Sequence, residues 1–305
     1  MKRGYLTVPF CGKSAVRYNT TMTDEQIKDL KLKANDIRIS IIDMLEDAGS
    51  GHTAGPLGMT DVFTAFYFHI LNHDPKNPDM EDRDRLILSN GHIVPVRYAT
   101  MAHAGYFPLE ELKTLRKFGS RLQGHPERHA LPGLENTSGP LGTGLGQAAG
   151  MAYAARLDGK KFHTFCLTGD GELDCGNIWE SAMFAAHHGL NNLTAVVDRN
   201  NIQINGMTEN VMKLGPLKDK WESFGWHVIE IDGHNFQDIV DAVNQAKAIQ
   251  EKPTCIIAHT IPGKGIKEIE NEYEWHGKPP STEEEQRFLK ELRSLKGTIE
   301  AGHMD

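Results

Sequence analysis

The chain has 305 residues, of which 39 % are hydrophobic and 24 % are charged, and its formal net charge is −8. Such a composition is typical of a globular protein with one large domain or two modest ones, and the negative charge argues against a nucleic-acid partner. We expect no membrane association, because no run of 18 apolar residues is present and the first residues lack the apolar core of a signal peptide. The four cysteines form no CxxC pair and two of them fall in apolar runs, which indicates reduced thiols and a cytoplasmic protein.

The first part of the chain is predicted to be helical. Residues 1–22 show no periodicity and are expected to form an N-terminal extension. A helix should begin at Thr23, which can cap it together with Gln26, and apolar residues then recur at helical spacing. Residues 49–58 (GSGHTAGPLG) are expected to be a loop, and residues 59–71 a second apolar helix that ends at a cluster of Pro, Asn and Asp residues.

From residue 85 onward, apolar runs of strand length alternate with helix-like segments. Residues 85–92 (RLILSNGH) predict a short buried strand and a turn, and residues 135–159 predict a glycine-rich loop that leads into a helix of small residues. Four more strands, separated by amphipathic helices, are predicted in 162–168 (FHTFCLT), 192–200 (NLTAVVDRN), 226–232 (WHVIEID) and 253–260 (PTCIIAHT). This alternation is typical of an α/β fold with a doubly wound, mostly parallel sheet and helices on both faces.

The predicted domain organisation is simple. The sequence contains no internal repeat and no low-complexity linker, so we expect a single α/β domain over residues 23–280. Residues 281–305 contain STEEEQRFLKELRSLK, a capped and highly charged helix. We expect this C-terminal helix and tail to be solvated or to face a partner.

A lone carboxylate stands between two glycines in LTGDGE, at the end of the FHTFCLT strand. Ligands of a doubly wound sheet bind beyond the carboxyl ends of its strands, and Gly169 and Gly171 let the backbone approach them closely. Asp170 cannot face a phosphate without repulsion, so we expect a divalent cation between the two. The next strand ends in DRNNIQI, which offers the Asn200 amide and the Ile202 carbonyl to complete the octahedron that Mg²⁺ prefers.

Each of these two signals is ordinary when taken alone. GDG is a common turn, since Asp and Gly are turn residues, and a polar segment such as DRNN often ends a strand. Their spacing of thirty residues places each at the end of a successive strand, which favours a shared site.

A GDG motif followed thirty residues later by Asn is similar to the fingerprint of thiamine-diphosphate enzymes. The segments that resemble the transketolase family, in its amino-terminal, diphosphate-binding domain, are GSGHTAGPLG, LSNGH, QGHPERH, TSGPLGTGLGQAAGMA, LTGDGELDCGNIWE, DRNNIQING and YEWHGKPP. They follow the family's order over most of the chain. The resemblance therefore implies that residues 23–280 are the diphosphate domain of a thiamine-diphosphate-binding fold.

The resemblance also implies a set of site residues. The metal, Mg²⁺ or Ca²⁺, would be held by Asp170, Asn200 and the carbonyl of Ile202. The residues implied to contact thiamine diphosphate are His52, His92, Gly139, Pro140, Leu141, Gly169, Asp170, Gly171, Glu172, Asn200, Ile202 and His276. The residues implied to act in catalysis are His52, His125, His276 and Glu180. Histidines suit ketol transfer, because imidazole titrates near neutrality and can exchange protons with sugar oxygens.

A partner is implied as well. In the transketolase family, the glutamate that faces the aminopyrimidine ring belongs to a second domain farther along the chain, and this sequence stops at Asp305. We therefore expect the amino-terminal subunit of a split transketolase, active with a separate pyrimidine-domain subunit in an α₂β₂ assembly. Its substrates would be phosphorylated ketoses and aldoses, with the arginine and serine contacts to the sugar phosphate on the partner.

Other functions are compatible with part of this pattern. Deoxyxylulose-phosphate synthase and 2-oxo-acid dehydrogenase components share the GDG and Asn fingerprint, but they lack the GHPE segment as it stands here. A non-catalytic module that binds thiamine diphosphate or a partner is a further alternative, although the intact ligand set argues against it.

Two positions have competing interpretations. Many family members carry glutamate where this chain has Cys175, whereas Glu180 matches the family's second acidic position on the same helix. Cys175 is either a small packed residue or a reactive thiol of low pKa near a helix start. His125 and His129 have the spacing of zinc ligands on a helix, but the Gly and Pro residues beside them favour a loop.

Overall fold

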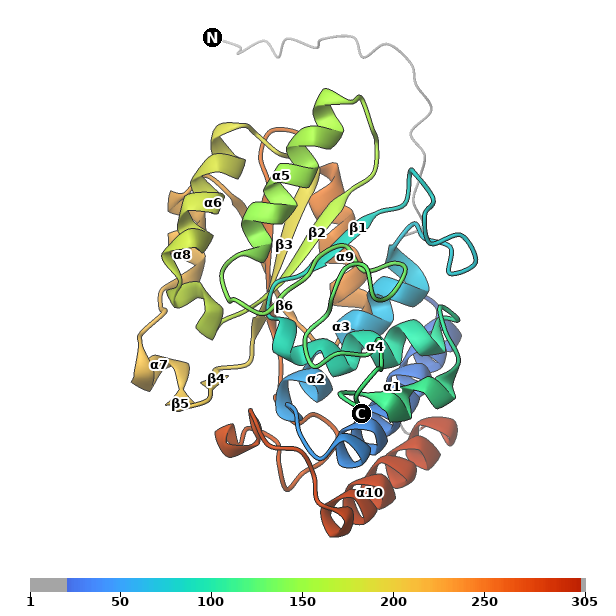
Figure 1. Ribbon diagram of the computed structural model, residues 1–305. Helices are drawn as coiled ribbons and strands as arrows, with labels where there is room; N and C mark the ends of the chain where they lie inside the picture. The colour runs from blue at the N-terminus through green and yellow to red at the C-terminus, as the bar shows by residue number, and fades with distance from the viewer. Residues whose placement is uncertain (1–20, 303–305) are drawn as a thin grey trace, which may run out of the picture.

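A computed structural model describes residues 21–302 and has a parallel sheet at its centre (Figure 1). Within that range the sheet has five strands in the order β1-β2-β3-β7-β6, and every neighbouring pair is parallel. The strands are β1 (Arg85–Leu88), β2 (Thr164–Gly169), β3 (Leu193–Arg199), β6 (His227–Asp232) and β7 (Thr254–His259). Four of them lie within segments predicted to be strands and β2 extends one residue past its predicted segment, and the predicted doubly wound α/β class is confirmed.

Alternate residues of each strand enter two separate hydrophobic cores. On β2, Phe165 and Leu167 belong to the first core and Cys166 to the second, and on β7 Ile256 and Ile257 divide in the same way. Successive side chains of a strand point to opposite faces of the sheet. Because both faces are covered, the strands are continuous apolar runs rather than alternating ones.

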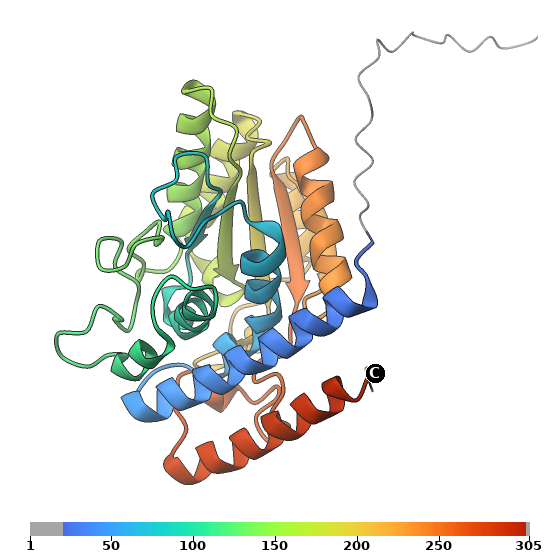
Figure 2. The same ribbon diagram turned by 90° about the vertical axis from the view of Figure 1, so that its right-hand side faces the viewer.

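Helices cover both faces of the sheet (Figures 1 and 2). The first core is covered by α1 (Asp24–Ala48), α3 (Thr60–Ala65), α4 (Val94–His103) and α9 (Phe236–Ala248). The second core is covered by α5 (Gly144–Leu157), α6 (Gly176–His187) and α8 (Leu217–Ser223). Shorter elements are the hairpin β4 (Ile202–Gln203) and β5 (Gly206–Met207), the helix α7 (Thr208–Val211), and the 3₁₀ turns η2 (Gly91–Ile93), η3 (Leu109–Thr114), η4 (Gly171–Asp174) and η5 (Tyr273–Trp275). Across residues 21–302, none of the helices combines the length and the apolar character needed to span a membrane.

The last helix, α10 (Thr282–Glu300), lies alongside α1 (Figure 2). Its Phe288 and Leu292 are buried in the first core, and Asn35 Nδ2 on α1 donates a hydrogen bond of 3.0 Å to the Leu292 carbonyl. The charges that dominate its sequence lie on the other side of this apolar stripe. The predicted helix therefore forms, but it packs as part of the domain and is not a solvated tail.

The N-terminal boundary also differs from the expectation. Most of the predicted extension, residues 1–20, lies outside the described residues. Met22, at its end, is buried, and its N–H donates to Gln237 Oε1 at 2.7 Å. Thr23 and Gln26 form the predicted capping box at the start of α1. The folded domain therefore includes Met22.

The sequence did not predict all helices between residues 49 and 103. The expected loop over 49–58 contains α2 (Ala54–Gly58), and the expected helix over 59–71 is divided into α3 and the π-helix η1 (Phe66–Ile70). The helix α4 was not predicted, and every residue from 94 to 102 in it is buried.

Candidate functional site

The ends of β2 and β3 and the segments that follow them line a cavity of about 400 Å³. Twelve of the fourteen predicted site residues line it: His52, His92, His125, Gly139, Leu141, Gly169, Asp170, Gly171, Glu172, Asn200, Ile202 and His276. The other two, Pro140 and Glu180, are exposed and do not line it. Five lining residues were missed: Asn90, Asp198, Gln203, Ile204 and Asn205. Each of these five residues is within three positions of a predicted site residue. The sequence motifs therefore include the cavity lining even where a single residue was not named.

Two buried carboxylates end the neighbouring strands β2 and β3. Asp170 follows β2 directly, Asp198 lies at the end of β3, and each is only 1 % exposed. Burial raises the pKa of Asp170 to about 6, although the Asn201 N–H and the Arg199 guanidinium oppose the rise. Burial also raises the pKa of Asp198 to about 7, and the neighbouring charge of Asp170 adds to the effect. Two buried carboxylates that are costly to ionise form a setting that a cation would stabilise.

A sharp turn after β3 brings Asn200 and Ile202 to Asp170. Asn201 adopts a left-handed φ of 63°, which Asn tolerates better than most residues, and its N–H donates to Asp170 Oδ2 at 2.7 Å. Asn200 Oδ1 accepts a hydrogen bond of 3.0 Å from the Ile202 N–H, and Asn200 Nδ2 donates to Asp198 Oδ2 at 2.8 Å. The amide is therefore held in one orientation beside the carboxylates.

Arg199 was not predicted as a site residue, yet it joins Asp170 to the segment after β5. Its Nη1 donates to Asp170 Oδ2 at 3.1 Å and to Thr208 Oγ1 at 2.9 Å, and its Nη2 donates to Glu209 Oε1 at 2.7 Å. Glu209 Oε1 also accepts the N–H of Leu214 at 3.3 Å. One guanidinium thus ties residues 208–214 to the carboxylate at the end of β2.

Three histidine rings from distant parts of the chain meet in the pocket. The ring centroids of His52 and His92 are 4.8 Å apart, those of His92 and His276 are 5.1 Å apart, and those of His52 and His276 are 5.6 Å apart. Burial, and then the neighbouring His276, lowers the pKa of His52 to about 4. Burial also lowers the pKa of His92 and of His276, so the three rings are neutral at pH 7.

Several buried polar atoms of the pocket have no hydrogen-bond partner within the described part of the chain. They are His52 Nδ1, Asn90 Oδ1, Gln203 Nε2 and His276 Nδ1. Buried polar groups are rarely left unpaired, so the pocket is suited to a polar ligand. A carboxylate, an amide oxygen and a backbone carbonyl are ligands that a hard divalent cation prefers, and the donor set therefore fits Mg²⁺ or Ca²⁺ beside a phosphate group.

Glu172 was predicted to contact a cofactor, but both of its oxygens already accept hydrogen bonds within the protein. Oε1 accepts from the Ser89 hydroxyl and, at 2.6 Å, from the Gly142 N–H. Oε2 accepts from the Gly169 N–H at 3.1 Å. The carboxylate is only 3 % exposed and holds three loops of the pocket together.

Cys175 is half-buried and stands directly before α6. It packs against Gly142, where a Cβ atom would lie 2.6 Å from Cys175 Cβ. Burial, and then the nearby charges of Glu172 and Asp174, raises the pKa of the thiol. The geometry supports the packed-residue interpretation, because a reactive cysteine needs a lowered pKa.

The geometry gives no support to the zinc alternative for His125 and His129. Both lie outside helices, in the loop between η3 and α5, as the neighbouring Gly and Pro residues indicate. Across residues 21–302, no group of three or more His, Cys, Asp and Glu side chains could hold a metal ion. The pair therefore has no third ligand of these types in that range.

The doubly wound sheet carries a polar pocket at the carboxyl ends of its strands, where ligands bind in this class of α/β protein. The family profile for the transketolase thiamine diphosphate binding domain matches residues 30–296. The chain therefore belongs to the transketolase family and contains its thiamine-diphosphate-binding domain.

This chain matches its relatives over different shares of their length. A 6-deoxy-6-sulfo-D-fructose transketolase subunit of Clostridium sp. (strain MSTE9) is 46 % identical over 80 % of this chain and 88 % of its own length. An apulose-4-phosphate transketolase subunit of Phocaeicola vulgatus is 38 % identical over 88 % of this chain and 95 % of its own. Human transketolase is 36 % identical over 88 % of this chain. Campylobacter jejuni transketolase has a solved structure that matches with a TM-score of 0.82, 36 % identity and 89 % coverage of this chain. The chain spans 43 % of each of these last two proteins.

Proposed function

We propose that this chain is the amino-terminal, diphosphate-binding subunit of a thiamine-diphosphate-dependent transketolase. Together with a separate subunit that carries the pyrimidine-binding domain, it transfers a two-carbon ketol unit between phosphorylated sugars in an α₂β₂ assembly. The observation that carries the proposal is the pocket, which gathers two buried carboxylates, three neutral histidines and unpaired polar atoms in a chain of the transketolase family.

The carboxyl edge of the sheet holds the cofactor in this proposal. Asp170, Asn200 and the Ile202 carbonyl bind Mg²⁺ or Ca²⁺, which offsets the charge of the diphosphate. The remaining proposed cofactor contacts line the pocket, except for the exposed Pro140: His52, His92, Gly139, Pro140, Leu141, Gly169, Gly171, Glu172 and His276. Bound thiamine diphosphate supplies the carbon nucleophile and the electron sink for carbon–carbon bond cleavage.

The histidines hold and move protons of the sugar. A neutral imidazole has one N–H donor and one acceptor nitrogen, so it can donate to a carbonyl oxygen and accept from a hydroxyl. His52 and His276 each have an unpaired Nδ1 within the described residues, and His125 lines the same pocket. Glu180 is exposed on α6, so the proposal assigns it to a contact with a neighbouring chain of the assembly and not to this pocket.

The split arrangement is supported by the relatives that are named as subunits. The chain spans 88 % and 95 % of the length of two of them, but 43 % of human transketolase. The cytoplasm is the proposed compartment, and the free thiols of Cys166, Cys175 and Cys255 are consistent with a reducing environment.

Co-expression of this chain with a candidate pyrimidine-domain subunit tests the proposal. The purified complex should transfer ketol groups from a phosphorylated ketose to an aldose phosphate, whereas this chain alone should not. Turnover by the chain alone at the rate of the complex would overturn the split arrangement. Pyruvate consumption by the complex would favour the deoxyxylulose-phosphate synthase or 2-oxo-acid dehydrogenase alternative, and cofactor binding without transfer to any acceptor would favour a non-catalytic module.

A further inference from the structure

The guanidinium of Arg116 lies between two Gly-His dipeptides at the pocket. A Cβ atom at Gly124 would lie 2.6 Å from Arg116 Cζ, and a Cβ atom at Gly51 would lie 3.9 Å from Arg116 Nε. His52 and His125, the residues that follow these glycines, both line the pocket. Glycine at position 124 is therefore what allows the arginine to reach this place.

The backbone holds Arg116 in an unusual conformation. Its φ is 60°, in the left-handed region that non-glycine residues rarely adopt. Its N–H donates to the Leu122 carbonyl at 2.9 Å, and the Leu122 N–H donates to Ser120 Oγ at 3.0 Å. Arg121 adds a bond of 2.9 Å from Nη2 to Glu111 Oε2. Strained residues that persist because the surroundings fix them concentrate at functional sites, which makes Arg116 a candidate for one.

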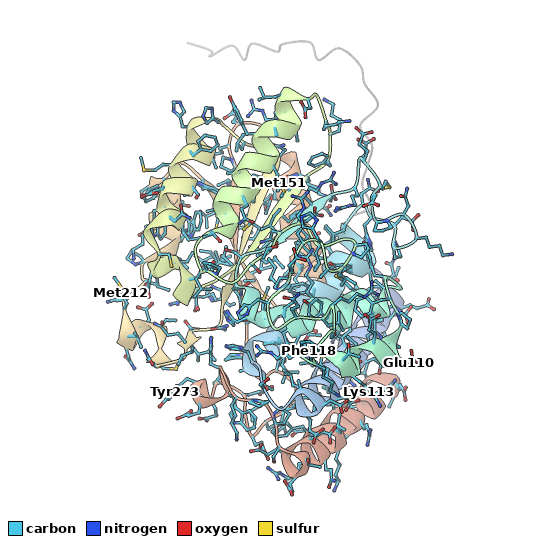
Figure 3. All side chains as sticks on the ribbon, viewed as in Figure 1. Glu110, Lys113, Phe118, Met151, Met212 and Tyr273 are labelled. Atoms are coloured by element: carbon cyan, nitrogen blue, oxygen red, sulfur yellow. The ribbon has the colours of Figure 1, made fainter. Side chains whose placement is uncertain are left out.

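Arg116 is exposed and does not itself line the pocket, and its charge has no partner within the described part of the chain. Among the residues that the structure describes, no carboxylate pairs with it and no acceptor takes a hydrogen bond from its guanidinium. Residues 115–129 contain four Lys or Arg residues and one acidic residue, in a chain whose net charge is −8. Phe118, labelled in Figure 3, is exposed on the same loop, so the loop reaches solvent. Arg121 of this segment is paired with Glu111, so within residues 21–302 Arg116 is the unpaired cation that lies beside the two histidines.

The two histidines beside Arg116 carry no charge of their own at neutral pH. Burial, and then His276 and Arg116, lowers the pKa of His52 to about 4, and burial followed by Arg116 lowers the pKa of His125. The guanidinium is therefore the fixed positive charge next to both rings. Its planar fork can bind two oxygens of one oxyanion at once.

We propose that Arg116 forms an oxyanion-binding subsite at the edge of the pocket, which takes the acidic end group of the sugar substrate. The end group is a phosphate or a sulfonate, since both present the tetrahedral oxygens that a guanidinium binds. The inference rests on the proposed function and extends it, because it places one contact to the acidic group on this chain in addition to those on the partner. Arg116 acts in binding and specificity and takes no part in proton transfer.

Inorganic phosphate and sulfate can test the subsite on the isolated full chain. The NMR signals of the His52 and His125 rings should shift and saturate during a phosphate titration, and Arg116→Asn should weaken the phosphate affinity about tenfold or more. Asn tolerates the left-handed backbone, so this variant should keep the fold, and an unchanged thermal unfolding midpoint checks that. Arg128→Gln, which removes an exposed arginine from the same segment, is the matched control and should leave the affinity unchanged. Equal phosphate affinity in the Arg116→Asn variant and the parent chain would overturn the proposal.

The complex with the partner subunit separates the two possible end groups. Arg116→Asn should raise KM for a phosphorylated ketose, or for a ketose sulfonate, about tenfold with kcat nearly unchanged, and the ketose with the larger increase identifies the natural end group. An unphosphorylated ketose should show no change in KM. An equal increase for charged and uncharged ketoses would overturn the subsite while ketol transfer stands. A complex that transfers no ketol group would overturn the proposed function instead, and the phosphate titration would still decide the role of Arg116.

Discussion

The carboxylate of Glu172 accepts a hydrogen bond of 2.6 Å from the backbone N–H of Gly142. This contact joins the turn after β2 to the glycine-rich loop before α5, two segments that both line the pocket. Ser89, after β1, donates to the same carboxylate oxygen. A residue that the family resemblance assigns to the cofactor is therefore also the brace of the loops around it.

Replacing Glu172 should destabilise the protein. Glu172→Ala leaves the Gly142 and Gly169 N–H groups without their acceptor, so we expect the free energy of unfolding to fall by about 2 kcal/mol or more. Glu172→Gln keeps one acceptor oxygen and should lose less. Urea unfolding followed by circular dichroism measures both variants. A Glu172→Ala variant as stable as the parent chain would show that the brace contributes nothing.

Asp170 should be essential for metal-dependent cofactor binding. We expect Asp170→Ala to weaken the binding of thiamine diphosphate in the presence of Mg²⁺ by more than the roughly 10–100-fold typical of an outer-shell partner. Isothermal titration calorimetry with and without the metal measures the effect. Asp174→Asn, which removes a carboxylate that does not line the pocket, is the matched control. Unchanged affinity in Asp170→Ala would remove this residue from the ligand set.

His163 should make the protein less stable in mild acid. It is 8 % exposed, its Nε2 lies 2.8 Å from Thr194 Oγ1, and burial followed by the charge of Lys247 lowers its pKa to about 3. Below pH 6.5 the unfolded chain binds a proton at this ring that the folded chain does not bind. The contribution to stability is therefore complete above pH 6.5 and falls by up to about 1.4 kcal/mol per pH unit as the pH drops toward 3.

Comparison of the parent chain with His163→Gln separates the contribution of His163 from that of the other titrating groups. The free energy of unfolding of the parent chain should fall more steeply between pH 6.5 and pH 4 than that of His163→Gln, which has no ring to protonate. Urea unfolding at intervals of pH gives both slopes. Equal slopes would mean that His163 does not stay neutral in the folded protein.

Cys175 should react slowly with thiol reagents at pH 7. Burial and the acidic neighbours raise its pKa, so only a small fraction is thiolate, and the rate should rise roughly tenfold per pH unit as the pH approaches that pKa. Peptide mass mapping after alkylation reports this cysteine separately from Cys166 and Cys255, which are fully buried and should not react in the native state. Rapid modification of Cys175 at pH 7 would restore the reactive-thiol interpretation.

Local patterns are sufficient to predict the sheet and the centre of the site. Each buried strand is a short apolar run that ends in polar residues, and Asp170 and Asn200 can be placed together because neighbouring parallel strands end at the same edge. The helix α4 was missed, because its mostly apolar residues directly follow the predicted strand and turn over 85–92 with no capping residue to mark a helix start. The sequence of α10 carries an apolar stripe, but only the tertiary structure shows that this stripe packs on α1 and not on a partner.

The positions of Arg199 and Arg116 could not be predicted from the sequence. Arg199 is the last residue of β3, a position typical of a solvated charge. Its contact to Asp170 exists because β2 and β3 end side by side, and its contact to Glu209 exists because the chain turns back through β4 and β5. Arg116 is equally ordinary in the sequence. Its position depends on Gly124, eight residues later in the chain, because a Cβ atom there would lie 2.6 Å from Arg116 Cζ.

The three neutral imidazoles of His52, His92 and His276 give the pocket a tautomeric rather than an ionic response to its ligand. A ring whose pKa is lowered from its usual value can exchange donor for acceptor by moving one proton between its own nitrogens, without a change of net charge. This side of the pocket can therefore bind a hydroxyl or a carbonyl oxygen with equal electrostatic ease, and it does so unchanged across the neutral pH range. If the two proposals hold, the cation bound at Asp170 and the guanidinium of Arg116 supply the charges that meet the two acidic groups of cofactor and substrate, while the three rings stay neutral.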